Sequence, residues 1–141
     1  MKEAHRRDGV AMINFLYWIE SNIWKEKISE LSICTKLREF RSRQEYFIGE
    51  SFHSIVGYAE HGAIVHYHVT EETNLTIEPN GILLIDSGGQ YLDGTTDITR
   101  TIALGEIMQQ QQDDFTLVLK GMIQLAKAIF SVNTMNVSTR K

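Results

Sequence analysis

Two aspartates, Asp86 and Asp97, lie in Ile82–Gly105, the stretch of this sequence whose residue types could best perform chemistry. The apolar run Ile82–Ile85 ends on Asp86, and a second strand-like run, Thr95–Leu104, contains Asp97. Buried strands seldom carry carboxylates unless a partner compensates the charge. Two such carboxylates among several threonines predict a cation held by oxygen ligands. The competing interpretation is a pair of turn and cap residues.

The geometry of the connection between the two runs limits this interpretation. β-Branched residues on both sides of Asp93-Gly94 predict antiparallel strands joined by a turn. A two-residue turn at Asp93-Gly94 would place Asp86 opposite Thr101, leaving the two aspartates roughly 13 Å apart along the strand. A shared cation therefore predicts an irregular hairpin, with a longer loop centred nearer Tyr91-Leu92 or a bulge at Gly88-Gly89.

Helical periodicity dominates the first part of the chain. Apolar residues three and four apart predict a helix from about Lys2 to Glu20. Ser29 or Ser32 can cap a second helix, which is expected to run to about Phe47. This helix carries arginines interleaved with glutamates, a pattern typical of a solvated face: Arg38, Arg41 and Arg43.

Short strands are expected after the second helix, over Ser54–Tyr58, over Ala63–Tyr67 and on both sides of the aspartate turn. A run of glutamines and aspartates follows, and then a helix over Phe115–Phe130 that is apolar on more than one face. Residues 131–141 are polar and are expected to be frayed. This order predicts an α+β fold with helices on one face of an antiparallel sheet.

The composition is that of one ordinary globular domain, with 141 residues, of which 43% are hydrophobic and 23% charged. A net charge of −4 argues against a nucleic-acid partner. Cys34 is the single cysteine, and its apolar neighbours favour a core position over a nucleophile. No apolar run is long enough to span a bilayer and no secretory signal is evident, so a cytoplasmic location without a membrane partner is expected.

Three segments together are specific to one family: Met1–Gly9, Gly62–Tyr67 and, at greatest length, Leu84–Thr101, which reads LIDSGGQYLDGTTDITRT. They closely resemble the Xaa-Pro aminopeptidases (aminopeptidase P) among the pita-bread metallopeptidases, which also include prolidase, methionine aminopeptidase and creatinase. The resemblance spans roughly residues 1 to 130. It implies the first α+β half of a pita-bread catalytic domain over residues 1–105 and the first helix of the second half over residues 106–130.

The resemblance also implies an activity and a site. The family releases an N-terminal residue that precedes proline, using two divalent metal ions, usually Mn²⁺, held by two aspartates, one histidine and two glutamates. By motif position, Asp86 and Asp97 match the two aspartates, with Asp97 bridging both ions. His66 matches a histidine beside the substrate and is the expected catalytic and substrate-binding residue. His68 would share a strand face with His66 and is expected to be structural or incidental.

The remaining metal-ligating histidine and both glutamates belong to later segments of the family pattern, and this chain stops before them. The resemblance therefore implies a truncated fragment, inactive alone, in which the metal ions are absent or weakly bound. The helix over Phe115–Phe130 is expected to bury its apolar side against another copy, giving a homo-oligomer. The alternative is a non-catalytic pita-bread module that binds peptides or proteins. His53 and His61 depart from the usual family pattern, which affects loop geometry and not the fold.

Overall fold

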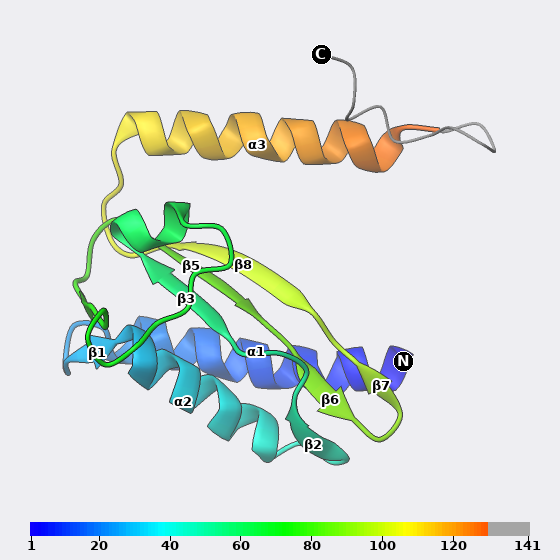
Figure 1. Ribbon diagram of the computed structural model, residues 1–141. Coiled ribbons are helices and arrows are strands. Elements are labelled where there is room, and N and C mark those ends of the chain that lie inside the picture. Colours follow the sequence, from blue (N-terminus) through cyan, green and yellow to red (C-terminus); the bar gives the residue numbers. More distant parts are fainter. Residues whose placement is uncertain (130–141) are drawn as a thin grey trace. The chain divides into compact units, whose positions relative to one another are not determined.

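The computed structural model describes residues 1–129, and the chain divides into two compact units between Ile107 and Met108 (Figure 1). The first unit contains two long helices and a set of antiparallel strands, and the second contains α3. The elements are α1 (Lys2–Asn22), β1 (Ile28–Ser29), α2 (Glu30–Ser42), β2 (Phe47–Glu50), β3 (Ile55–Tyr58), the 3₁₀ helix η1 (Ala59–Ala63), β4 (Thr76–Ile77), β5 (Ile82–Ser87), β6 (Gly89–Tyr91), β7 (Gly94–Thr95), β8 (Ile98–Ala103) and α3 (Gln109–Lys127).

The two N-terminal helices begin where the sequence predicts, but α2 ends earlier. Ser29 caps α2: its hydroxyl accepts from the Ser32 N–H (3.3 Å), while the Ser32 hydroxyl accepts from the Ser29 N–H (2.8 Å). The predicted extension of this helix to Phe47 is wrong. Phe47 instead opens β2, where its ring packs edge-on against Tyr91 at 5.7 Å.

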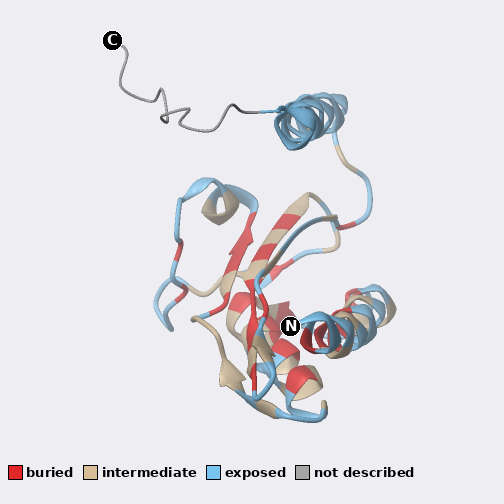
Figure 2. Cartoon of the chain, turned by 90° about the vertical axis from the view of Figure 1, so that its right-hand side faces the viewer, coloured by how far each residue is buried: buried red, intermediate tan, exposed pale blue. Residues whose placement is uncertain are grey.

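One face of the main sheet is covered by α1 and α2 (Figure 1). The sheet has the antiparallel order β3-β5-β8, and burial alternates along β5 so that every second residue faces the helices. Figure 2 shows the buried residues on these strands and on the two helices. The core contains Phe15, Ile19, Ile33, Leu37, Val56, Leu83 and Ile85. The predicted α+β fold with helices on one face of the sheet is confirmed.

Residues 63–67 do not form the predicted strand. The chain turns back in η1, the Tyr67 N–H donates to the Ile64 carbonyl (3.2 Å), and His66 has a left-handed φ of 54°. The backbone of η1 passes directly over Gly57, where a Cβ would lie 2.8 Å from the backbone of His61. This close approach diverts the chain from the sheet, so the short alternating pattern does not become a strand.

Helix α3 begins six residues before the predicted start, within the glutamine-rich run. The side chains of Gln109 and Gln110 donate to Asp113 and Asp114, each at 2.9 Å and one turn further along. Such pairs stabilise a helix, which is why the polar run is helical. No residue within the bounds of α3 is buried. Phe130 and the expected frayed tail lie outside the described residues.

Candidate metal centre

The hairpin that carries the two aspartates turns at Leu92-Asp93, one residue earlier than the Asp93-Gly94 turn. Near the tip, Gln90 pairs with Thr95 and Tyr91 with Gly94. Further from the tip, Ser87 pairs with Ile98. Both ladders are centred on the same turn, so a single register runs through the whole hairpin.

The predicted irregularity of the hairpin is therefore wrong. No bulge interrupts the register at Gly88-Gly89, and the loop is not centred on Tyr91-Leu92. The register shift lies in β2 instead, between Phe47 and Gly49. The two aspartates lie two positions apart across the hairpin instead of four, because the turn lies one residue earlier than Asp93-Gly94; no bulge is needed.

Asp86 pairs with Thr99 across the ladder, and Asp97 comes two residues before Thr99. Residues two apart on a strand point to the same face, so the aspartates are diagonal neighbours on one face. Diagonal neighbours are separated by about 7–8 Å, a distance that two carboxylates and bound cations can span. The Thr99 hydroxyl donates to Asp86 Oδ1 at 2.9 Å and orients that carboxylate.

The face that carries the aspartates points away from the helices. Asp86 is half-buried and Asp97 is exposed, which corrects the expectation that both are buried in strands. Solvent and the Thr99 hydroxyl therefore offset the charge without a core partner. Within residues 1–129, no three His, Cys, Asp or Glu side chains lie close enough together to hold a metal ion. On this face the two candidate ligands are therefore the carboxylates of Asp86 and Asp97 alone, among residues 1–129.

Close backbone packing fixes the segment between the two aspartates. The Gly89 N–H donates to the Thr96 hydroxyl (2.8 Å), and the Ser51 hydroxyl donates to the Thr96 carbonyl (2.9 Å). A Cβ at Gly88 would collide with that same carbonyl and with the Ser51 hydroxyl. Only glycine allows the strands to approach this closely, so the relative position of Asp86 and Asp97 has little freedom.

A buried ion pair attaches the tip of this hairpin to the helices. Asp8 of α1 accepts from Arg41 Nε (2.7 Å), from Arg41 Nη2 (3.2 Å) and from the Tyr91 hydroxyl (2.9 Å). Asp8 and Arg41 are both 0% exposed, so the expectation that Arg41 lies on a solvated helix face is wrong. Burial, followed by the hydrogen bond to Asp8, raises the pKa of Tyr91. In the turn itself, the Arg7 guanidinium pairs with Asp93 and lowers the pKa of that carboxyl.

Sequence reasoning missed this support, although Asp8 and Tyr91 both lie in the segments that carry the family resemblance. The usable signal was a charged residue embedded in an otherwise apolar helix stripe. Asp8 precedes the stripe of Met12, Phe15 and Ile19 by one helical turn and shares its buried side.

The expected substrate-side histidine, His66, lies on the segment between η1 and β4 and is exposed. It is therefore positioned by a different part of the chain from the aspartate hairpin. His68 is also exposed, and its ring packs edge-on against His53 with centroids 5.6 Å apart. The prediction that His68 shares a strand face with His66 is wrong, because no strand forms there.

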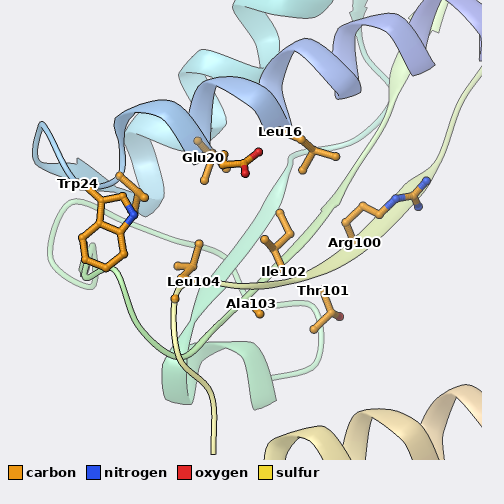
Figure 3. A pocket seen from close by; sticks show the side chains of 11 residues that line it. Leu16, Glu20, Trp24, Arg100, Thr101, Ile102, Ala103 and Leu104 are labelled. Carbon is orange, nitrogen blue, oxygen red and sulfur yellow. The ribbon is translucent and has the colours of Figure 1, made fainter.

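A cavity of about 620 Å³ lies between α1 and the outer edge of β8, as Figure 3 shows. Side chains including Leu16, Glu20, Trp24, Arg100 and Ile102 line it. Neither aspartate nor His66 contributes to the lining. The chemistry of the side chains, and not the volume of this cavity, therefore identifies the candidate site. Separately, the helices in the described part of the chain are each too short or too polar to cross a membrane.

Comparison with known proteins is consistent with this geometry. The model of metallopeptidase family M24 matches residues 1–138. A protein of Tuber melanosporum named Probable Xaa-Pro aminopeptidase P is 44% identical, over 95% of this chain and 22% of that protein. A protein of the same name from Arthroderma gypseum is 42% identical, over 94% of this chain and 21% of that protein. The chain thus spans about a fifth of the length of these curated relatives.

Solved structures give the same result. An X-prolyl aminopeptidase from Caenorhabditis elegans, described as a cytosolic enzyme with a di-nuclear active site, superposes with a TM-score of 0.84 at 37% identity, covering 92% of this chain and 22% of that one. An Xaa-Pro dipeptidase from Bacillus anthracis gives a TM-score of 0.77 at 27% identity, covering 92% and 34%. The resemblance to Xaa-Pro aminopeptidases is confirmed, and the fold is part of a pita-bread domain. This chain belongs to metallopeptidase family M24.

Proposed function

We propose that this chain supplies the first part of the metal centre of an aminopeptidase that releases an N-terminal residue preceding proline. One observation carries the proposal: Asp86 and Asp97 lie on one open sheet face as diagonal neighbours. The names of the curated relatives supply the substrate class, a peptide with proline at its second position. In this proposal residues 1–105 are the first α+β half of the catalytic domain, and residues 106–130 begin the second.

The donor set fits a hard divalent cation, because both side chains offer carboxylate oxygens. Asp86 would bind one ion and Asp97 would bridge two, with Mn²⁺ as the proposed metal. When bound, two such ions supply Lewis-acid activation of water and of the peptide carbonyl. The Thr99 hydroxyl, which donates to Asp86, would hold that ligand in orientation. His66 would contact the substrate and hold or move a proton there.

The ligand count limits what these 141 residues do by themselves. After Asp97 the sequence contains no histidine or cysteine, and its carboxylate side chains are those of Glu106, Asp113 and Asp114. Two carboxylates provide few of the ligands that a dinuclear centre needs. We therefore propose that the chain alone binds Mn²⁺ weakly and does not cleave Xaa-Pro peptides.

A titration of the isotopically labelled chain with Mn²⁺ tests the site, because this paramagnetic ion broadens nearby NMR signals. Broadening should begin at Asp86, Asp97 and Thr99 and should disappear in an Asp86→Asn/Asp97→Asn variant. The matched control, Asp113→Asn/Asp114→Asn on α3, should leave it unchanged. Equal broadening at all carboxylates, or no effect of the first variant, would favour the alternative of a non-catalytic binding module. Mn²⁺-dependent cleavage of an Xaa-Pro peptide by the purified chain would contradict the proposed inactivity.

Location and assembly belong to the same proposal. The Caenorhabditis elegans relative is described as cytosolic, which supports a cytoplasmic location. Helix α3 exposes apolar side chains, among them Leu117, Val118, Met122 and Leu125. Self-association through this helix would bury them. A monomeric mass by light scattering at high protein concentration would exclude it.

A further inference from the structure

A second buried carboxylate, Glu30, lies outside the aspartate site. It is the first residue of α2 and is 0% exposed. Four donors converge on it: Tyr58 N–H on Oε1 (2.9 Å), His61 Nδ1 on Oε1 (2.9 Å), Leu75 N–H on Oε2 (3.1 Å) and the Tyr67 hydroxyl on Oε2 (3.4 Å). Both oxygens of one buried side chain are therefore fully engaged.

The donors match the two acceptor oxygens of a carboxylate. Backbone N–H groups can only donate, so each oxygen of Glu30 accepts at least one hydrogen bond. With Glu30 as a carboxylate, His61 Nδ1 is the donor of the hydrogen bond that the two side chains share. The N-terminus of α2 adds its positive dipole end to the same place. The buried negative charge is stable only while these donors stay in position.

The donors lie on both sides of His66 along the chain. Tyr58 and His61 precede it, and Tyr67 follows it directly. The ring of Tyr67 stacks on that of His61 with centroids 4.3 Å apart, and the Tyr67 hydroxyl also lies within hydrogen-bond distance of the Thr73 hydroxyl (3.1 Å). The segment from His61 to Tyr67 is thus closed into a loop, because both of its ends contact the Glu30 carboxylate.

This closure matters because no strand pairing orders the segment. Residues 59–75 contain η1 and turns but no strand, and connections of this length are ordinarily mobile. His66 also adopts a left-handed φ of 54°, which is unfavourable for a residue other than glycine unless its surroundings hold it. The stacked His61–Tyr67 pair, fixed by Glu30, provides that restraint.

We propose that Glu30 is the positioning residue for His66: it fixes both flanks of the His66 turn to the rigid start of α2. The assignment of His66 to the substrate side rests on the proposed function, whereas its positioning by Glu30 does not. Glu30 touches neither substrate nor metal in this role. It determines where the imidazole of His66 is presented.

Backbone ¹⁵N relaxation of the full chain tests the proposal in two variants. Glu30→Gln keeps the side-chain shape but turns an amide NH₂ toward one set of N–H donors. Tyr67→Phe removes a single hydroxyl from the cluster. In both, the order parameters of residues 64–68 should fall from about 0.85 to below about 0.6. The matched control is Tyr17→Phe, at a tyrosine on α1 that is 72% exposed, and it should leave these values unchanged.

A purely structural role for Glu30 gives a different result. Its loss would then lower the unfolding midpoint while residues 64–68 kept their order, or would reduce order evenly over residues 1–107; either outcome overturns the proposal. If Glu30→Gln does not fold, Tyr67→Phe decides the question. The measurement needs neither metal nor peptide. Its failure is therefore distinct from failure of the Mn²⁺ titration, which tests the proposed function.

Discussion

Removal of the Asp8 carboxylate should destabilise the first unit more than any change on its surface. In Asp8→Ala, the buried Arg41 guanidinium loses the acceptor of two hydrogen bonds, and Tyr91 loses the acceptor of its hydroxyl. Breaking a buried pair by removing one partner costs about 3–5 kcal/mol. Arg41 Nη1 already has no hydrogen-bond partner within residues 1–129, so the cation has no alternative acceptor there. We therefore expect a loss near the upper end, about 4–5 kcal/mol.

The companion variant separates the ion pair from simple packing. Asp8→Ala/Arg41→Met removes the unpaired Arg41 charge as well as the carboxylate. Its free energy of unfolding should be at least about 2 kcal/mol higher than that of Asp8→Ala. Urea unfolding, followed by circular dichroism and checked for a constant m-value, measures both. The control is the exposed Glu3–Arg6 pair at 3.5 Å, where Glu3→Ala should cost less than about 1 kcal/mol. The reasoning is refuted if Asp8→Ala costs no more than this control, or if the double variant is no more stable than Asp8→Ala.

Three further predictions concern single positions. Burial raises the pKa of Cys34 to about 11. Iodoacetamide should therefore alkylate the folded chain slowly at pH 7 and rapidly only near pH 11 or after unfolding. Fast labelling of the folded protein at pH 7 would contradict this. Gly88→Ala should lower the free energy of unfolding, measured in urea, by several kcal/mol, because the new Cβ meets the Thr96 carbonyl. Gly121→Ala, where nothing lies within 4 Å of the new Cβ, should instead raise the helix signal in circular dichroism. Equal effects of the two variants would count against the close packing at Gly88. The pKa of Tyr91 is higher in the folded state than its unfolded value of about 10. Above about pH 10 the unfolded state therefore loses this proton while the folded state keeps it, and the free energy of unfolding should fall as the pH rises. Tyr91→Phe should reduce this dependence of stability on pH, and an unchanged dependence would exclude Tyr91 as its source.

Local patterns predicted the parts of the fold that local interactions determine. The stripe of Met12, Phe15 and Ile19 gave α1, and the capping serine at Ser29 gave the start of α2, because both signals act within one or two helical turns. The strand pair around the aspartates followed from β-branched residues on both sides of a turn. The α+β class needed no more than this order of elements.

Patterns failed where the decisive partner is distant in sequence. Arg41 resembles a surface arginine until Asp8, on another helix, is known to face it. Gly94 was predicted to lie in the turn, at Asp93-Gly94. In the structure its lack of a side chain instead allows close packing against α1, because a Cβ there would lie 3.1 Å from the Ala4 Cβ. The turn itself lies one residue earlier, at Leu92-Asp93, which halves the offset between the two aspartates from four positions to two.

The candidate site shows the same division. The types of Asp86 and Asp97 and the motif around them identified the candidate ligands, whereas the separation of the two aspartates across the hairpin depends on register. The motif located His66 in the sequence but did not predict its local structure, because η1 packs over Gly57 before it and the predicted strand does not form. The identity of a candidate residue is thus readable from sequence earlier than its orientation.

The length of α2 sets the distance between two buried charges that hold different parts of the candidate site. Glu30 stands at its first residue and Arg41 about three turns further along, so both charges emerge on the same side, about 16 Å apart. One end anchors the His66 turn, and the other, through Asp8 and Tyr91, anchors the tip of the aspartate hairpin. Helix α2 therefore acts as a spacer between two groups of the candidate site. One residue inserted between its ends would rotate one charge by about 100° away from its partners and uncouple the two groups.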